Sequence, residues 1–512
     1  MIIITFAGKL LGLFRDSIIG SHYGTDSVEG AAYNIASQLP RNFMDIMFAA
    51  VVTANFIPVF NLVMQKRGRD AAYETSYRFI SLIVYLSAAV TVILMLLARP
   101  IVSAYSGGTP DGIVPLGTTL LRVMLPLIIL SCAAFSLTGI LQSMGEFNIP
   151  AAMALVSNVP ILVYLIFFLN KFGTIGLCAV FLLGWALQLA IQLPFLKKNG
   201  FKFRFKFPSL SQIRKDEDLR QIALLAVPVM VGTWVAPVNF FVNGLAATHS
   251  GAGSQAYNAL AYANTLYSVL TGVVILSISN LIFPKLSAMA ANDDSSAFDL
   301  TMRQTIRVIL YLMIPMALGL IAVGQPLIRL YYERGNFDAA STSLTSSALV
   351  CFAAGMPGFG LQTVLARGFY ARREGKTPLY TGIAAMAANL GLSFLLMRFM
   401  RGAEGPALAS SVAITIVAGL MLWRMGRRSK AVLEKKLLFD ALKMLAAGAV
   451  MFALSWLVRE GVQARMGGGL AGKALTVVLP VLVGVAVYLP LTLALRVDEA
   501  KIAVGMVRRK RK

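Results

Sequence analysis

Long apolar runs recur along the whole chain, and they constrain its fold more than any other feature. A helix needs about 20 apolar residues to cross the hydrocarbon core of a bilayer, which is about 30 Å thick. Because lipid offers the backbone no hydrogen-bond partners, such runs predict an all-α polytopic membrane protein. We count about 14 transmembrane helices, at residues 1 to 21, 31 to 63, 74 to 98, 117 to 143, 150 to 170, 174 to 196, 220 to 247, 255 to 288, 299 to 323, 342 to 367, 378 to 398, 406 to 424, 437 to 458 and 470 to 495.

The composition supports this class and excludes others. Hydrophobic residues make up 57% of the chain and charged residues 13%, whereas about 25% of a soluble domain is charged. The net charge of +23 comes from basic residues between the apolar runs, where they face anionic membrane lipid rather than nucleic acid. The three cysteines show no metal-ligand spacing, and no glycine-rich phosphate loop is present. We therefore expect a transporter rather than an enzyme, with no metal, no cofactor and no nucleic-acid partner.

The distribution of basic residues predicts the orientation in the membrane. Lysine and arginine gather in alternate loops, whereas residues 22 to 30 and 248 to 254 contain neither. The basic loops lie at residues 66 to 69, 197 to 215, 372 to 376 and 427 to 436, and the tail at 508 to 512 is basic as well. By the positive-inside rule, both termini are expected in the cytoplasm.

An internal repeat relates the two halves of the chain. The pairs Tyr33 and Tyr257, Pro58 and Pro284, and Pro150 and Pro378 are separated by 224, 226 and 228 residues in similar sequence contexts. Because each half has an even number of spans, the two halves form parallel six-helix repeats, and transporters place their substrate between such halves. The predicted domains are an N-terminal repeat at 1-196, a basic cytoplasmic linker at 197-219, a C-terminal repeat at 220-424, a basic cytoplasmic loop at 425-436, two additional transmembrane helices at 437-495 and a basic cytoplasmic tail at 496-512.

Three charges lie inside the first apolar run, in the stretch GKLLGLFRDSIIG at residues 8 to 20. Each charge at a bilayer centre costs about 2.5–3.5 kcal/mol on insertion scales, so Lys9, Arg15 and Asp16 are candidate substrate-binding residues. On a helix Lys9 and Asp16 share a face and Arg15 is rotated from both, so one acid cannot neutralise both cations equally well. The alternative is an internal salt bridge that locks the spans together.

The second run adds a further cation and several polar residues. Pro40 is expected to bend or break its helix beside Arg41, which becomes a candidate ligand; alternatively, Arg41 only pairs with Asp45, four residues further on. Asn55 and Asn264 are candidate polar lining residues of a wet lumen, although single asparagines in spans often connect helices instead.

With these residues laid out, the chain resembles the MurJ/MviN lipid II flippases of the MOP transporter superfamily. GKLLGLFRDSIIG is similar to the opening motif of that family, and QLPRNFMDIMFAAVVTANFIPVF is similar to its second span. RGFYARREGKTP matches a turn of the family, and YYERGNFD and SMGEFNIPA also fit. The resemblance covers nearly the full length, and the family fold has fourteen spans with a twelve-span repeat.

The resemblance implies a function. Family members move a peptidoglycan precursor, an undecaprenyl pyrophosphate that carries a sugar and a peptide, from the inner to the outer leaflet. Cations of a central cavity meet the pyrophosphate, and the two extra spans form a groove for the tail. Lys9, Arg15 and Asp16 fall on the charged positions of the opening motif. The chain departs from the family at Met44, Ala31 and Thr265, where other members carry charged residues.

Several functions remain open at this point. The leading interpretation is a flippase for lipid II in the bacterial plasma membrane, with anionic lipid and envelope-synthesis proteins as partners. The alternatives are a flippase for another lipid-linked oligosaccharide, a multidrug or small-solute antiporter of the same superfamily, and a scaffold without transport activity. An antiporter for organic cations should carry acidic lumen residues, whereas the first span has two cations and one acid.

Overall fold

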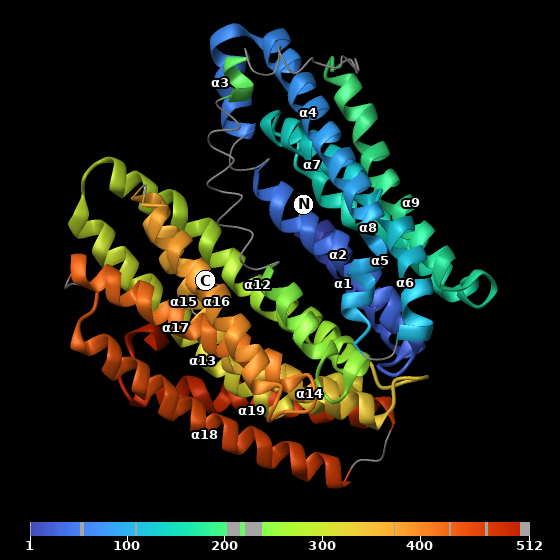
Figure 1. Cartoon of the computed structure of the whole chain (residues 1–512). Helices are drawn as coiled ribbons and strands as arrows, with labels where there is room; N and C mark the ends of the chain where they lie inside the picture. The colour runs from blue at the N-terminus through green and yellow to red at the C-terminus, as the bar shows by residue number, and fades with distance from the viewer. Residues whose placement is uncertain are drawn as a thin grey trace. The chain divides into compact units, whose positions relative to one another are not determined.

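A computed structural model describes residues 2 to 51, 56 to 107, 110 to 201, 216 to 220, 238 to 372, 374 to 429, 432 to 465 and 469 to 501. Within these ranges every regular element is a helix, so the all-α prediction is confirmed. The chain forms two compact units, Met1–Phe241 and Val242–Lys512 (Figure 1).

Most predicted spans correspond to helices that are long and apolar enough to cross a membrane. The described residues contain 10 of these helices, or 11 if one bent pair counts as a single span. The first unit contains α4 (Arg69–Leu96), the stretch Gly112–Ser143 formed by α6 (Pro110–Met124) and α7 (Leu127–Ser143), α8 (Asn148–Phe167) and α9 (Leu169–Lys198). The second unit contains α12 (Gly253–Ala291), α13 (Ser295–Tyr331), the bent pair α14 (Ala339–Ala354) and α15 (Met356–Ala371), α16 (Lys376–Leu396), α17 (Glu404–Arg428), α18 (Lys435–Arg465) and α19 (Leu470–Ala494).

The other three predicted spans, at residues 1 to 21, 31 to 63 and 220 to 247, are not among these helices. The helices α1 (Ile2–Tyr23) and α2 (Val28–Val51) each contain three charged residues. The helix α3 (Ile57–Arg67) completes the predicted second span, of which residues 52 to 55 lie outside the described ranges. The span at 220 to 247 is described from residue 238, where the helix Val238–Thr248 begins. Pro40 lies within α2 and does not end it, so the expected break is absent there.

Small residues allow α1 to lie close to α8. A Cβ atom at Gly8 would be 3.1 Å from the Cβ of Ala154 and 3.3 Å from the backbone nitrogen of Leu155. At Gly12 the corresponding atom would lie 3.5 Å from the side-chain nitrogen of Asn158. The spacing of the two glycines is typical of close helix contacts in membranes, where packing replaces the hydrophobic effect as the driving force.

The last two helices are attached to the second unit by a buried ion cluster. Figure 1 shows α18 and α19 beside α13, and both pack against it. The Arg307 guanidinium on α13 lies 2.8 Å from the Asp440 carboxylate on α18 and 2.7 Å from the Glu499 carboxylate. Asp498 is 3.1 Å away. The side chains of Arg307 and Asp440 are only 12% and 3% exposed, so this cluster fixes the added helices to the repeat.

We predict that Arg307→Ala destabilises the protein by about 3–5 kcal/mol, because it leaves buried carboxylates without their cation. Arg303→Ala is the matched control on the same helix, since its partner Glu434 is 46% exposed and such exposed pairs contribute about 0–1 kcal/mol. Denaturant unfolding of the purified protein in detergent measures both changes. Equal losses in the two variants would contradict the assigned role of the cluster.

Candidate functional site

Arg15 and Asp16 of α1 form a half-buried network with α8. Arg15 Nε donates to Asp16 Oδ1 at 2.8 Å, and Arg15 Nη1 donates to Asn158 Oδ1 at 2.8 Å. The Arg15 guanidinium also lies over the Phe181 ring of α9, 5.2 Å from its centre. The side chains of Arg15 and Asp16 are 12% and 17% exposed. The acid therefore pairs with the neighbouring arginine.

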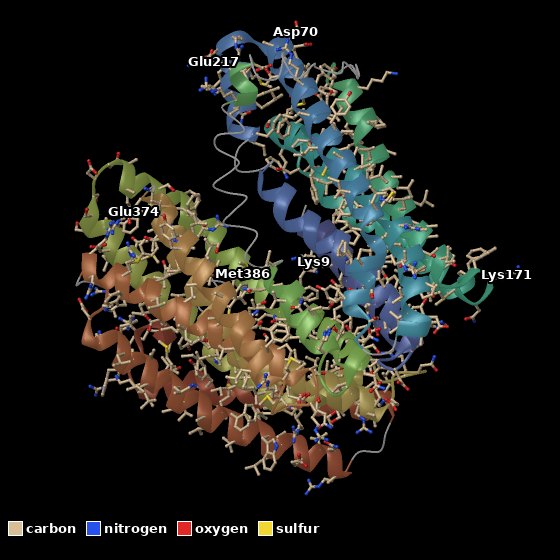
Figure 2. All side chains as sticks on the ribbon, in the orientation of Figure 1. Lys9, Asp70, Lys171, Glu217, Glu374 and Met386 are labelled. Atoms are coloured by element: carbon tan, nitrogen blue, oxygen red, sulfur yellow. The ribbon has the colours of Figure 1, made fainter. Side chains whose placement is uncertain are left out.

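Lys9 is placed differently from Arg15. Its side chain is exposed, and Figure 2 shows it on α1. Within the described part of the chain, no carboxylate lies within ion-pair distance of its ammonium group. Because Asp16 neutralises Arg15, Lys9 carries the excess positive charge of this helix. Its ammonium group can therefore meet an anionic ligand without first breaking a contact within the protein.

Asn158 positions the charged network. Its side chain is 5% exposed, and its amide accepts a hydrogen bond from Arg15 while donating to the backbone oxygen of Gly8 at 3.2 Å. A buried amide is stable only when both of its ends have partners. Asn158 therefore fixes the position of α1 against α8 and the direction of the Arg15 side chain.

The second unit has a neutral network at the equivalent place in its repeat. Asn389 lies on α16, the counterpart of α8 in the repeat, and its amide donates to Asn243 Oδ1 at 2.9 Å. Asn243 lies on the helix Val238–Thr248, the counterpart of α1. Ser393 also donates to Asn243, at 3.1 Å. Each repeat thus connects the equivalent pair of its own helices. The contact uses charged groups in the first unit and amides and hydroxyls in the second.

The other predicted site residues are only partly described. Arg41 is half-buried on α2, and both Arg41 and Arg15 lie within electrostatic range of the Tyr33 hydroxyl. Tyr33 is 2% exposed, and its hydroxyl has no hydrogen-bond partner among the described residues. Asn264 is half-buried on α12 of the second unit. Asn55 and the side chains of Met44 and Asp45 lie outside the described residues.

An apolar groove lies within the second unit. Its volume is about 530 Å³, and residues of α13, α18 and α19 form most of its walls, including Leu320, Met451 and Val481. Gly484 allows α19 to approach α18, because a Cβ atom there would lie 2.9 Å from the Ser455 hydroxyl. Apolar walls of this kind favour a hydrocarbon ligand.

Sequence reasoning missed Asn158 and Phe181 as parts of this site, and gave the groove only as what the family resemblance implies. The contact of Asn158 with Arg15 depends on the packing of α1 against α8, which the sequence does not show. Phe181 had no signal, because an aromatic residue in an apolar span is the normal case. The groove likewise requires three helices to be placed together.

We predict that Asn158→Ala destabilises the protein by about 1.5–3 kcal/mol, because it removes a hydrogen bond to the charged Arg15 side chain. Denaturant unfolding in detergent compares the variant with the wild type. Unchanged stability would show that Arg15 does not depend on Asn158.

Together, the fold and the site define a polytopic transporter with an internal repeat, a charged network in a span and an apolar groove. A solved multidrug resistance MATE family transporter of the MOP superfamily, in an inward-facing conformation, has a similar fold. It gives a TM-score of 0.69 at 16% identity, over 84% of this chain and 96% of that one.

Comparison with known proteins identifies the family of the chain. The model of the lipid II flippase MurJ family matches residues 21–471, so the chain belongs to this family. A probable lipid II flippase MurJ of Rhizobium tropici is 27% identical over 99% of this chain and 94% of the relative. A probable lipid II flippase MurJ of Vibrio cholerae is also 27% identical, over 96% of this chain and 94% of the relative. A solved lipid II flippase MurJ in an inward closed conformation has a TM-score of 0.77 at 21% identity, over 97% of this chain and 98% of that one.

Proposed function

We propose that this protein moves lipid II, a polyprenyl-pyrophosphate-linked peptidoglycan precursor, from the inner to the outer leaflet of the bacterial plasma membrane. The observation that carries the proposal is the family match over residues 21–471. The chemistry of the chain supports it, because such a lipid combines an anionic head with a long apolar tail. A charged network in a span and an apolar groove are the two kinds of site that this ligand requires.

The predicted topology and domains form part of the proposal. The positive-inside rule supports two cytoplasmic termini. The repeats at 1-196 and 220-424 would alternate in exposing the substrate to the two sides, as transporters built from paired repeats do. Anionic lipid around the basic loops and envelope-synthesis proteins are the partners expected for this function.

Lys9 would bind the pyrophosphate. It is exposed, whereas Arg15 already donates to Asp16 and Asn158. A charge-assisted hydrogen bond from an ammonium group to a phosphate oxygen is strong wherever water is scarce. Arg15 contributes positive charge to the same helix and keeps its orientation through α8, and Arg41 contributes a third cation in this unit.

We predict that Lys9→Glu abolishes transport, whereas Lys9→Arg retains it, because the phosphate contact needs a cation. Protein abundance should not change, since Lys9 is exposed. Lys171→Glu is the matched control, an exposed lysine on α9 of the same unit (Figure 2). Growth of a strain depleted of its own lipid II flippase measures activity. Full growth with Lys9→Glu would remove Lys9 from the site.

The apolar groove would hold the polyprenyl tail. Gly319 lines it, and a Cβ atom at this position would find only the terminal methyl of Met451 in the described surroundings, 3.9 Å away. A large side chain at Gly319 therefore enters the groove without displacing the protein. It would occupy the volume that the tail needs.

We predict that Gly319→Leu reduces transport at least tenfold without loss of stability, since leucine favours the helix by about 0.8–1 kcal/mol over glycine. Gly391→Leu is the matched control, because that glycine lies on α16 with open space around it. Complementation and thermal unfolding are measured for both. Wild-type complementation by Gly319→Leu would show that the groove does not hold the tail.

The similarity of fold to a multidrug resistance transporter keeps an antiporter as a second candidate. Depletion of the protein in its native host separates the alternatives. If lipid II accumulates in the inner leaflet, the proposed function is supported. Accumulation of another polyprenyl-linked sugar would identify a different substrate, and unchanged lipid pools would favour an antiporter or a scaffold.

A further inference from the structure

We propose that the outer end of the apolar groove carries a phosphate-binding exit site, formed by Arg329 and Lys473. The pyrophosphate of the transported lipid would rest there after crossing, while its tail still lies in the groove. This inference rests on the proposed function and on the predicted topology, in which the end of α13 and the start of α19 face the outside.

A second, polar cavity provides the site. Its volume is about 390 Å³, and it is lined by Arg329, Glu333, Gln463, Lys473 and Thr476. These residues come from the end of α13, the turn that follows it, the end of α18 and the first turns of α19. The cavity therefore lies where the two added helices meet the repeat.

Positive charge exceeds negative charge in this cavity. Glu333 Oε1 accepts from Arg329 Nε at 2.9 Å and from Lys473 Nζ at 3.3 Å, and Thr342 donates to the other oxygen at 2.9 Å. Burial raises the pKa of the Glu333 carboxyl, but these hydrogen bonds outweigh it and the net pKa lies below the usual value. One ionised acid thus faces two cations.

The Arg329 guanidinium has capacity for a further ligand. In the described structure Arg329 donates to Glu333 only through Nε, and its side chain is 45% exposed. A guanidinium carries five N–H donors, and its outer edge matches two phosphate oxygens. Arg307, near the other end of the groove, is instead surrounded by three carboxylates. Of these two arginines, only Arg329 can therefore donate to a phosphate.

The polar cavity and the groove are lined by neighbouring residues of the same two helices. On α13, Val323 and Leu327 line the groove while Arg329 lines the polar cavity. On α19, Val477 lines the groove and Thr476 the polar cavity. An apolar groove that ends beside a cationic pocket fits a ligand with a long hydrocarbon chain and a phosphate head.

Glu333 does not fully offset the unfavourable position of Lys473, because it shares its carboxylate with Arg329. Lys473 lies in the first turns of α19, where the positive end of the helix dipole disfavours a cation, and no acid occupies the first turn. The positive-inside rule also disfavours lysine and arginine outside. An anionic ligand removes both penalties, because it is attracted by the lysine and by the helix end together.

Cysteine protection in the full-length protein tests the inference. Gln463→Cys reports on the polar cavity and Val477→Cys on the groove, and the labelling rate with N-ethylmaleimide is measured in nanodiscs of phosphatidylethanolamine. The probes are undecaprenyl pyrophosphate, undecaprenol and phosphatidylglycerol. We expect undecaprenyl pyrophosphate to slow labelling of both reporters at least fivefold, and undecaprenol to slow that of Val477→Cys alone.

Charge variants then identify the cations. Each cysteine reporter is combined with Arg329→Ala and Lys473→Ala together. In this background, undecaprenyl pyrophosphate should no longer protect Gln463→Cys but should still protect Val477→Cys. Arg465→Ala, an exposed arginine at the end of α18, is the matched control and should change neither. A variant that has Lys473→Arg and keeps Arg329 should show normal protection of Gln463→Cys, because both positions then carry a cation.

The outcomes separate this inference from the proposed function. Protection of Val477→Cys without protection of Gln463→Cys would overturn the exit site and leave the flippase intact. Protection of Gln463→Cys by undecaprenol, or equally by phosphatidylglycerol, would also overturn it, because the site would then not select a polyprenyl phosphate. Protection of neither reporter by undecaprenyl pyrophosphate would count against the proposed function itself.

Discussion

A charge at membrane depth is costly without a partner, and this cost shapes both units. Isolated charges at membrane depth are costly, so they pair with one another or with buried amides. In the first unit Arg15 is held by Asp16 and Asn158, and this contact fixes α1 on α8. In the second unit Arg307 is held by the carboxylates of the added helices. The same interaction therefore defines a candidate binding surface in one unit and attaches two helices in the other.

The two repeats share a contact between equivalent helices but differ in the charge of the residues that make it. Asn158 and Asn389 lie on equivalent helices, and each connects its helix to the first helix of its own repeat. Only the partners differ: the network of Asn158 includes an ion pair, and that of Asn389 consists of amides and hydroxyls. Duplicated folds can keep a contact that both halves need while one half acquires charge for a ligand.

The ligand that best fits this arrangement has two dissimilar parts. A lipid-linked pyrophosphate needs cations for its head and apolar walls for its tail, and no single environment supplies both. Under the proposed function, Lys9 would meet the head, and the groove formed by α13, α18 and α19 would hold the tail. At the proposed exit of the lipid, the cations of the polar cavity would likewise bind the head while the neighbouring groove holds the tail.

The sequence by itself determined the class, the approximate spans and the repeat, because bilayer thickness and backbone hydrogen bonding leave few options for long apolar runs. It also identified Lys9, Arg15 and Asp16 as unusual, since charges in a span are costly wherever they point. Only the tertiary structure decided how these charges are used. Whether Asp16 pairs with Arg15 or with Lys9 depends on side-chain directions and on Asn158 across the helix contact. The groove and its polar end likewise required α13 and α19 to be placed together, because contacts between residues far apart in sequence leave no periodic pattern in either segment.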